Sequence, residues 1–362
     1  MVHIRRKKVG IFTWDFEPIE GGMGVQALEL YNALLHDSEF EPVVFSPRKN
    51  SLLNHFQLRK ISSGKVGQLL FSFQCAFQLE SLIKKHSLDI VHFIGSSGGV
   101  QLLKKPSVPC VFTLNNTYFY LARKFNSSIF RFMRFLEKIS LKNADKKTAI
   151  SEGIVSEINT VQNEDISVVY MGIDAEIFKP LSIKQERIIL YVGRLVERKG
   201  VFDLLHAFAK LKNNGFSLLF IGDGSAKQEL IQTAQNLSVD KNVKIISKID
   251  RAQLPEFYSK AALVVLPSWS EGFGLTIAEA MACGAVVLGS DIVGIRDQIN
   301  DSENGFLFEV QNQADLAEKI DHILLLGSVA EKIRKAAIEK AAIFSSQKML
   351  ADYKKLYTGL LR

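Results

Sequence analysis

Cysteine is scarce in this sequence of 362 residues, and its scarcity excludes several classes of protein. The three cysteines, Cys75, Cys110 and Cys283, are widely separated and odd in number. Such a set provides neither a disulfide framework nor the paired spacing of a zinc site, so we predict no bound metal. Unpaired cysteines are typical of a reducing compartment, and we therefore expect a cytoplasmic protein.

Long hydrophobic runs and biased segments are also missing. No apolar run reaches the roughly 18–20 residues that a bilayer span needs. The opening segment MVHIRRKKVGIFTW passes from a basic cluster into a strand-like run, which does not resemble a signal peptide. Hydrophobic residues make up 47% of the chain, and no low-complexity tract or internal repeat is visible. These features favour a globular protein with sizeable cores.

Acidic residues are fewer than basic ones, and the formal net charge is +7. A basic protein suits nucleic acid, membrane surfaces or anionic small substrates. Much of the excess is local, because residues 118–147 hold eight Lys or Arg and two acids. The basic residues are Arg123, Lys124, Arg131, Arg134, Lys138, Lys142, Lys146 and Lys147. No nucleic-acid-binding motif accompanies them, so we expect no nucleic acid partner.

Short strand-like runs alternate with longer helical runs along the chain. The strand patterns include residues 9–14, 89–94 and 108–114, and in a second series 188–192, 217–221 and 263–267. Alternation with helices predicts βαβ units and parallel sheets. Two series predict an α/β protein of two doubly wound, Rossmann-like domains that face each other across a cleft. We place the boundary near Pro180, with domains at residues 1–178 and 179–344.

The segment EGFGLTIAEAMACG, residues 271–284, follows a predicted strand and runs into a predicted helix. It therefore lies at the carboxyl edge of the sheet, where ligands of such folds bind. Gly272 and Gly274 allow the backbone to approach a ligand, and the helix start favours an anion. Glu271 and Glu279 flank this loop and can accept hydrogen bonds from hydroxyls. The pattern suits a ligand with hydroxyls at two places and a phosphate between them, such as a nucleotide sugar.

The segment YVGRLVERKG, residues 191–200, follows the first strand of the second domain. Gly193 makes the turn, and Arg194 and Lys199 can converge on a diphosphate, the first as a fork and the second as a point charge. Arg198 competes with Lys199 for that role, and a solvated basic loop is the alternative.

The segment IEGGMG, residues 19–24, follows the first strand of the chain and opens a predicted helix. Its backbone N–H groups can hold a phosphate or an acceptor. It is not a GxGxxG fingerprint, and no acidic residue ends the next strand, so we expect no nicotinamide cofactor.

Together these segments resemble motifs of the retaining glycosyltransferases of family 4 (glycosyl transferases group 1), which have the two-domain GT-B fold. EGFGLTIAEAMACG is similar to the E-x7-E signature, GRLVERKG to the phosphate-binding loop and EGGMGV to the N-terminal glycine loop. Further similar segments, in the expected order, are DIVHFIG, TAISEGI, VVYMGIDAEIFKP, DIVGIRDQI and ENGFLF. The resemblance covers nearly the whole chain and is strongest in its second half.

The resemblance implies a role for each matching residue. Glu279 is expected to bind the ribose hydroxyls, and Glu271 the hydroxyls of the transferred sugar. Arg194 and Lys199 are expected to hold the diphosphate and stabilise the departing nucleotide, which makes them catalytic together with Glu271. The remaining expected donor contacts are Gly22, Gly193, Gly272, Phe273, Gly274, Leu275 and Thr276.

The resemblance also implies the use of the two domains. The N-terminal domain is expected to bind the acceptor, and the C-terminal domain the nucleotide sugar, which is a co-substrate and not a cofactor. Enzymes of this kind need no metal, because a cationic pair, here Arg194 and Lys199, neutralises the diphosphate instead. The final helix, about residues 345–362, is expected to pack on the N-terminal domain.

The chain departs from the family at Asn115, where a histidine is common. An amide can hydrogen-bond a sugar hydroxyl but cannot exchange a proton near neutral pH. We expect Gly21, Asn115 and Asn116 to contact the acceptor or the sugar. His92, in DIVHFIG, is a lone histidine after a strand, and the structural interpretation is favoured over a catalytic one.

Residues 118–143 interleave aromatic residues with cations, Phe125, Phe130, Phe132 and Phe135 among them. Such a helix suits the interface of an anionic membrane, and a core helix with one charged face is the alternative. On the membrane interpretation, the enzyme transfers a hexose, from a UDP-sugar, to a glycolipid or cell-surface glycan. It would then act as a peripheral protein on the inner face of the cytoplasmic membrane, in polysaccharide or lipopolysaccharide synthesis.

Two alternatives from other classes remain open at the level of sequence. A nucleotide-sugar epimerase of related fold needs acid and base residues, and Asn115 argues against it. A non-catalytic subunit that binds nucleotide sugar or glycan is disfavoured by the presence of Glu271, Glu279, Arg194 and Lys199 together.

Overall fold

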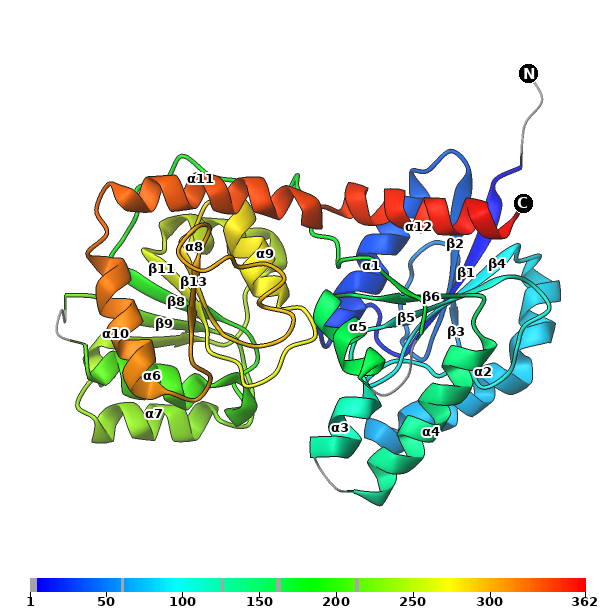
Figure 1. Ribbon diagram of the computed structural model, residues 1–362, viewed down its shortest axis with the longest axis horizontal. Helices are drawn as coiled ribbons and strands as arrows, with labels where there is room; N and C mark the ends of the chain where they lie inside the picture. Colours follow the sequence, from blue (N-terminus) through cyan, green and yellow to red (C-terminus); the bar gives the residue numbers. More distant parts are fainter. Residues whose placement is uncertain (1–4, 60–61, 125–126, 161–163, 212–214) are drawn as a thin grey trace. The chain divides into compact units, whose positions relative to one another are not determined.

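The computed structural model describes residues 5–59, 62–124, 127–160, 164–211 and 215–362 (Figure 1). Two compact units make up the chain: Met1–Gly172 with Ser346–Arg362, and Ile173–Ser345. The sequence-based boundary after residue 178 therefore lies inside the second unit. Ile173 is tied to that unit because its N–H donates to the carbonyl of Phe344, at 2.8 Å.

The first unit contains, in its described residues, a parallel sheet of seven strands in the order β3-β2-β1-β4-β5-β6-β7. The strands are β1 (Lys7–Thr13), β2 (Phe40–Ser46), β3 (His55–Gln57), β4 (Ile90–Gly95), β5 (Cys110–Leu114), β6 (Lys146–Ala149) and β7 (Ile166–Val168). The order reverses between β1 and β4, which is the point where doubly wound folds bind ligands.

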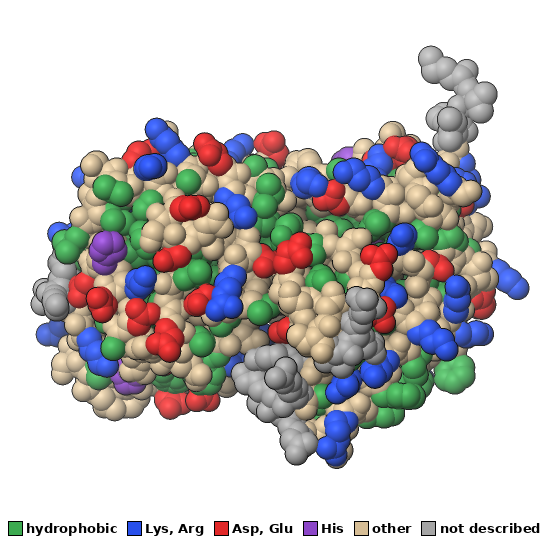
Figure 2. All heavy atoms as spheres, viewed as in Figure 1, with side chains coloured by type: hydrophobic (Ala, Val, Ile, Leu, Met, Phe, Trp, Pro, Cys, Tyr) green, Lys and Arg blue, Asp and Glu red, His purple; other side chains and the backbone are tan. Residues whose placement is uncertain are grey.

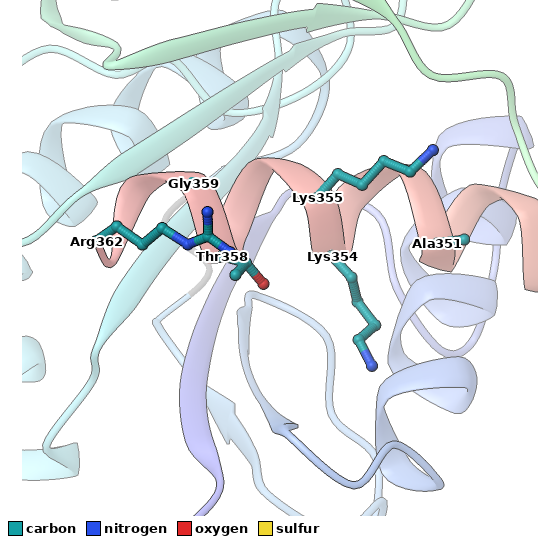
Figure 3. Close-up of a pocket in the computed structure, with 6 residues that line it drawn as sticks. All are labelled: Ala351, Lys354, Lys355, Thr358, Gly359 and Arg362. Carbon is teal, nitrogen blue, oxygen red and sulfur yellow. The ribbon is translucent and has the colours of Figure 1, made fainter.

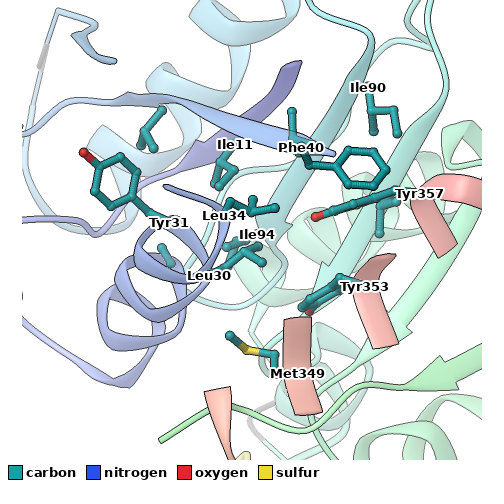
Figure 4. Packing of buried hydrophobic residues seen from close by; sticks show 14 of the residues in the cluster. Ile11, Leu30, Tyr31, Leu34, Phe40, Ile90, Ile94, Met349, Tyr353 and Tyr357 are labelled. Atoms are coloured by element: carbon teal, nitrogen blue, oxygen red, sulfur yellow. The ribbon is translucent and has the colours of Figure 1, made fainter. Parts of the chain in front are cut away.

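Helices cover this sheet on both faces. They are α1 (Gly22–Leu35), α2 (Gly64–His86), α3 (Tyr118–Lys124), α4 (Ser128–Asn143), α5 (Glu152–Asn159) and α12 (Ser346–Leu360). The last helix returns to the first unit through a stripe of Met349, Tyr353 and Tyr357, spaced by four residues, so that all three lie on one helix face. That stripe enters the core formed by α1 and the central strands (Figure 4).

The alternation of side chains along β1 separates two cores. Val9 and Ile11 point into the cluster that contains α1 and α12. Phe12 points to the other face, where it stacks between Phe45 and Phe93 at centroid distances of 4.7 and 4.8 Å. Because successive side chains of a strand face opposite ways, a short apolar run fills both sides of a central strand.

The second unit contains a six-stranded parallel sheet over the part of the chain that the structure describes, in the order β10-β9-β8-β11-β12-β13. The strands are β8 (Ile188–Val192), β9 (Ser217–Ile221), β10 (Val243–Ile246), β11 (Leu263–Leu266), β12 (Val287–Ser290) and β13 (Phe306–Phe308). The α-helices are α6 (Val201–Ala209), α7 (Lys227–Asn236), α8 (Leu254–Lys260), α9 (Leu275–Ala282), α10 (Gln313–Leu324) and α11 (Val329–Ala341). The strand order reverses between β8 and β11.

Both units therefore have the α/β, doubly wound architecture that the alternating sequence pattern predicts. No helix of the described residues is long and apolar enough to cross a membrane.

Candidate active site

The predicted donor residues other than Gly22 follow β8 and β11 in the chain, and these two strands are neighbours in the second sheet. The loop of residues 193–200 follows β8, and the loop of residues 267–274 follows β11. Gly200 joins them: it has a φ of 67°, and a Cβ atom there would overlap the carbonyl of Pro267. Only glycine meets both conditions without strain, so the sequence GRLVERKG fixes how closely the two loops approach.

Glu271 is the anionic centre of this site. Its carboxylate forms an ion pair with Lys199, and the two side chains are 13% and 14% exposed. Ser268 also donates to it, at 2.7 Å. Burial acts to raise the pKa of Glu271, but Lys199, Ser268 and the charge of Arg198 outweigh burial and lower the pKa below its usual value. Glu271 is therefore an ionised hydrogen-bond acceptor, held in place before any ligand arrives.

Arg194 and Arg198 form the cationic part of the site. Both residues are exposed, and neither guanidinium has a hydrogen bond or ion pair with the described residues. Partial burial of its guanidinium, followed by the charge of Arg194, lowers the pKa of Arg198. Glu271 balances part of the charge of Arg198, but no carboxylate of the described residues bonds either guanidinium, so the two like charges favour an anion. The structure thus separates the three cations, because Lys199 is paired with Glu271 and the two arginines are not paired.

Gly193 has a φ of 155°, and the N–H group of this residue donates to Ile221 at 2.9 Å. The hydroxyl of Tyr191 donates to the carbonyl of Arg194 at 2.8 Å. These bonds hold the turn after β8 and set the direction in which Arg194 leaves it.

The turn of residues 272–274 is anchored from below. Phe273 is 2% exposed and packs edge-on against Phe344, at a centroid distance of 5.3 Å. The buried amide of Gln298 donates to the carbonyls of Phe273 and Gly294, the latter at 3.2 Å. Gly272 and Gly294 are packed closely, since a Cβ atom on Gly294 would lie 2.7 Å from the carbonyl oxygen of Gly272. The carbonyls of this turn are therefore held by the protein.

Gly274 caps α9 with a φ of 91°, and Leu275 and Thr276 are the first residues of the helix. The hydroxyl of Thr276 donates to the carbonyl of Val192 at 3.1 Å. Thr276 therefore ties the start of α9 to the end of β8. This structural role is in addition to the contact with the donor that the sequence predicts.

Glu279 lies one turn inside α9, and it has two partners in the protein that the sequence analysis does not anticipate. Its side chain is 7% exposed and forms an ion pair with Arg251, with a distance of 2.9 Å from Nη2 to Oε1. The other carboxylate oxygen accepts from the hydroxyl of Tyr258 at 3.0 Å. Arg251 in turn lies over the ring of Phe178, 4.9 Å from its centroid. A ribose hydroxyl therefore has to share Glu279 with these donors or displace one of them.

The first unit places an acid at its glycine loop. Gly21 caps α1, Gly22 is the first helical residue, and the carboxylate of Asp15 accepts from the N–H of Glu20 at 3.1 Å. A Cβ atom on Gly24 would lie 2.7 Å from that carboxylate. The start of α1, where a phosphate is one sequence-based expectation, is therefore next to a carboxylate of the protein.

Asn115 and Asn116 follow β5. The amide nitrogen of Asn115 donates to Gln26, and its Oδ1 is buried without a hydrogen-bond partner in the described structure. Asn116 uses its own Oδ1 to accept from the N–H of Thr117 at 3.1 Å. Asn116 thus stabilises the turn, and Asn115 keeps an acceptor atom unused.

His92 has the structural role that the sequence analysis favours. It is fully buried and lies between the hydroxyl of Tyr357, at 2.7 Å, and that of Thr113, at 2.6 Å. Burial lowers the pKa of His92 to about 3, so the ring is neutral at ordinary pH.

Other features do not belong to this site. Figure 3 shows a hollow along α12, lined by Ala351, Lys354, Lys355, Thr358, Gly359 and Arg362. None of these residues lies at a strand end, and Lys354 is paired with Asp37 at 2.8 Å. Among the described residues, no group of three or more His, Cys, Asp and Glu is arranged to hold a metal ion.

Five residues that contact the predicted site residues or their loops lie outside the motifs found in the sequence. Their sequence signals are weak because each reaches its partner from a distant element; they are Asp15, Gln26, Arg251, Tyr258 and Gln298.

Two doubly wound units, one with a carboxylate and a cluster of cations at its strand ends, define a GT-B glycosyltransferase. The model of the family "Glycosyltransferase Family 4" matches residues 20–177, and that of "Glycosyl transferases group 1" matches residues 173–340. The chain belongs to family 4 of the glycosyltransferases.

Individual relatives agree with this assignment. The chain is 26% identical to N-acetyl-alpha-D-glucosaminyl L-malate synthase of Bacillus anthracis, over 98% of this chain and 97% of that protein. Its fold is similar to that of sucrose-phosphate synthase from Thermosynechococcus elongatus, with a TM-score of 0.84, 20% identity and coverage of 98% and 99%. It is also similar to Alr3699/HepE of Anabaena in complex with UDP and glucose, with a TM-score of 0.71, 17% identity and coverage of 98% and 100%.

Proposed function

We propose that this glycosyltransferase moves a hexose, with retention of configuration and without a metal, from a UDP-sugar to a sugar hydroxyl of a lipid-linked or cell-surface glycan. The observation that carries the proposal is the arrangement at the ends of β8 and β11. There an ionised Glu271, paired with Lys199, lies near two arginines whose guanidinium groups bond no carboxylate of the described residues. A sugar with free hydroxyls and a diphosphate match these two parts.

The cations suit a departing nucleotide. When the bond between the anomeric carbon and the phosphate oxygen breaks, the diphosphate keeps the electron pair and gains negative charge. Arg194 and Arg198 are available to stabilise that charge, and Lys199 adds a third positive charge next to Glu271. Fixed cations perform here the task that a divalent metal performs in other transferases, which is the basis for proposing metal independence.

Retention is proposed because it goes with the resemblance to the retaining family, and a route without a covalent intermediate because Glu271 is better placed to bind than to attack. Its pairing with Lys199 and Ser268 makes it a weak nucleophile and a good acceptor for sugar hydroxyls. The acceptor hydroxyl would then attack from the face that the diphosphate leaves, forming the new bond. The departing phosphate oxygen is the nearest base for the proton of that hydroxyl. Positioning and charge stabilisation would supply the catalysis.

UDP is proposed as the nucleotide because the structure of Alr3699/HepE contains UDP and glucose. That likeness supports the choice of UDP for the first experiments, and the other bases serve as comparisons within the same experiments.

The loop after β1 favours an uncharged acceptor. The segment from Trp14 to Gly24 contains Asp15, Glu17 and Glu20 and no Lys or Arg. Arg48 neutralises part of this charge, since it pairs with Glu20 at 2.6 Å and with Asp15 at 3.5 Å. The Bacillus anthracis relative is named for a malate product, and malate is a dianion. The acidic loop here repels such an acceptor and suits a neutral sugar.

The surface of α2 and α4 favours an acceptor at a membrane. On α4, Ile129, Phe132 and Phe135 are 50%, 45% and 58% exposed. On α2, Val66, Phe73 and Phe77 are 58%, 39% and 87% exposed. The cations Arg131, Lys138 and Lys142 lie on α4 and are exposed. Figure 2 shows hydrophobic and basic side chains together on this side of the first unit.

Large exposed aromatic residues among cations suit the interface of an anionic bilayer better than water. We propose that this surface holds the enzyme at a membrane that carries the acceptor. Phe125 lies outside the described residues, as do the side chains of Arg123 and Lys124.

Nucleotide release in water tests the donor part of the proposal. The protein would be incubated with UDP-glucose, GDP-mannose, ADP-glucose and dTDP-glucose, and the free sugar would be observed by proton NMR before it mutarotates. We expect release from the UDP-sugar, an α-anomer from the α-linked donor, and no effect of EDTA. A β-anomer would contradict retention, and loss of release in EDTA would contradict metal independence.

Vesicle flotation tests the membrane part. Phe132→Ser/Phe135→Ser should reduce binding to vesicles with anionic lipid, and neutral vesicles should bind neither protein. The matched control is Leu325→Ser, because Leu325 is 76% exposed but belongs to the second unit. Equal binding of the double variant and the control would contradict the proposed surface.

A further inference from the structure

Asn115 is the end of a chain of hydrogen bonds that begins on the returning helix α12. The hydroxyl of Tyr353 accepts from Nε2 of Gln26 at 3.2 Å, and Oε1 of Gln26 accepts from Nδ2 of Asn115. Gln26 and Tyr353 are both fully buried, so water does not compete for these bonds. The chain connects the C-terminal helix to the residue that follows β5.

The direction of these bonds determines what Asn115 offers. Tyr353 has one proton, and its hydroxyl also bonds Thr113 at 3.1 Å. When that proton goes to Thr113, the Tyr353 oxygen accepts from Gln26, and the Gln26 carbonyl accepts from Asn115. Burial raises the pKa of Tyr353 to about 12, so the hydroxyl keeps its proton in the working range. The amide oxygen of Asn115 therefore points away from Gln26.

The amide oxygen of Asn115 is the one atom of this chain of hydrogen bonds that has no partner among the described residues. Oδ1 of Asn115 is buried, and no hydrogen-bond partner for it exists among the described residues. A buried acceptor without a donor is destabilising. The oxygen itself is closed to solvent although the residue as a whole is half-buried, so a hydroxyl reaches Oδ1 only when neighbouring side chains give way. An unused acceptor, at a carboxyl strand end where this fold class binds ligands, has the chemistry to accept from a hydroxyl.

We propose that Tyr353 and Gln26 are positioning residues: they hold the amide of Asn115 so that its oxygen, and not its nitrogen, is presented to the sugar hydroxyl expected at this position. The inference rests on the proposed function, which supplies sugar hydroxyls from two sources: the transferred sugar and the acceptor. It gives the C-terminal helix a part in substrate recognition, beyond its packing on the first unit.

The same helix offers a matched control. Tyr357 lies one turn after Tyr353, is equally buried, and bonds His92 at 2.7 Å instead of Gln26. Tyr353→Phe and Tyr357→Phe each remove one buried hydroxyl from the same helix face. Only the first removes the oxygen that accepts from Gln26; Tyr357 is linked to that oxygen at a distance, through His92 and Thr113.

The test measures kcat and KM for Tyr353→Phe, Asn115→Ala, their double variant and Tyr357→Phe. Hydrolysis of the UDP-sugar reports on the transferred sugar, and transfer to an octyl glucoside reports on the acceptor. We expect Tyr353→Phe and Asn115→Ala each to lower kcat/KM by roughly tenfold. Whichever assay shows the loss for one variant should show it for the other. The double variant should lose no more than Asn115→Ala, because Tyr353 acts through Asn115. Gln26→Met, which interrupts the middle of the chain, should repeat the effect of Tyr353→Phe.

Losses that multiply in the double variant, or an equal loss in Tyr357→Phe at equal thermal stability, would overturn the inference. Binding of the UDP-sugar to each variant, measured separately by calorimetry, keeps the two proposals apart. If the wild-type protein binds no nucleotide sugar, the proposed function fails. If every variant binds it and kcat/KM does not change in Tyr353→Phe, only the positioning role fails.

Discussion

Single residues at this site have their charge states set by partners in the structure. Glu271 shows this most directly, because burial and pairing act in opposite directions on its pKa and pairing is stronger. The sequence analysis predicts Glu271 and Lys199 as parts of one site, but spacing does not reveal that they form an ion pair. The bond becomes visible only when the loops after β8 and β11 are brought together at Gly200.

Lys199→Ala should shift the acid side of the pH profile of kcat/KM toward higher pH. The variant leaves Glu271 partly buried without its counter-ion, so the pKa of Glu271 rises and its carboxylate is lost earlier as the pH falls. The matched control is Lys260→Ala, which breaks an ion pair with Glu256 on the surface of the same unit. An unchanged acid side in Lys199→Ala would show that Glu271 does not titrate with activity.

His92→Gln should reduce the sensitivity of the first unit to acid. The pKa of His92 is about 3 in the folded state, below the ordinary value, so the unfolded chain binds the extra proton. The contribution of neutral His92 to stability is complete above pH ~6.5 and is lost by about 1.4 kcal/mol per pH unit as the pH falls toward 3. Melting temperatures from pH 7 to pH 4 should fall less steeply in the variant. Parallel curves would contradict this assignment.

At the scale of elements, long periodic segments are predictable and short ones are not. A helix is expected at residues 129–141, and α4 covers Ser128–Asn143. The strands β3 (His55–Gln57) and β13 (Phe306–Phe308) have three residues each, too few to show an alternating pattern. The residues around Arg251 and Gln298 were missed for a similar reason, because their roles depend on tertiary contacts and not on any local pattern.

The turns at strand ends depend on glycine, and Gly200→Ala tests this. The new Cβ atom would add a clash with the Pro267 carbonyl to the cost of a φ of 67°. Gly327→Ala is the control, because Gly327 has a φ of 52° but no atom within 4 Å of the added Cβ. We expect the control to lose about 1 kcal/mol of unfolding free energy and Gly200→Ala about 1–3 kcal/mol more. Chemical denaturation measures both, and equal losses would argue against the close approach of the loops.

At the scale of the whole molecule, the chain has one continuous and one interrupted unit. Residues 329–361 read as largely helical in sequence, but the helix is broken near Ser345, where the second unit ends and α12 begins. The buried tyrosines of α12 give this helix a place in the first unit, and the family resemblance anticipates that return.

The two units should differ when they are produced separately. Ile173–Ser345 contains a complete sheet and all of the predicted donor residues except Gly22, so it should unfold cooperatively. Residues 1–172 lack Met349, Tyr353 and Tyr357, whose burial stabilises the unit by about 1.5–3 kcal/mol each. This fragment should be largely unfolded until a peptide of residues 346–362 is added. Circular dichroism during denaturation measures both, and a stable 1–172 fragment would contradict the role assigned to α12.

The most direct test of the central claim is the binding of nucleotide sugars to the ends of β8 and β11. Thermal unfolding would be measured with UDP-, GDP-, ADP- and dTDP-sugars for the wild type, Arg194→Ala/Arg198→Ala and the control Lys260→Ala. At a ligand concentration about 100 times Kd, stabilisation of about 2.7 kcal/mol is expected. We predict such a shift with the UDP-sugar in the wild type and the control, and its loss in the double arginine variant. A shift that survives in that variant, or no shift with any nucleotide sugar, would contradict the account.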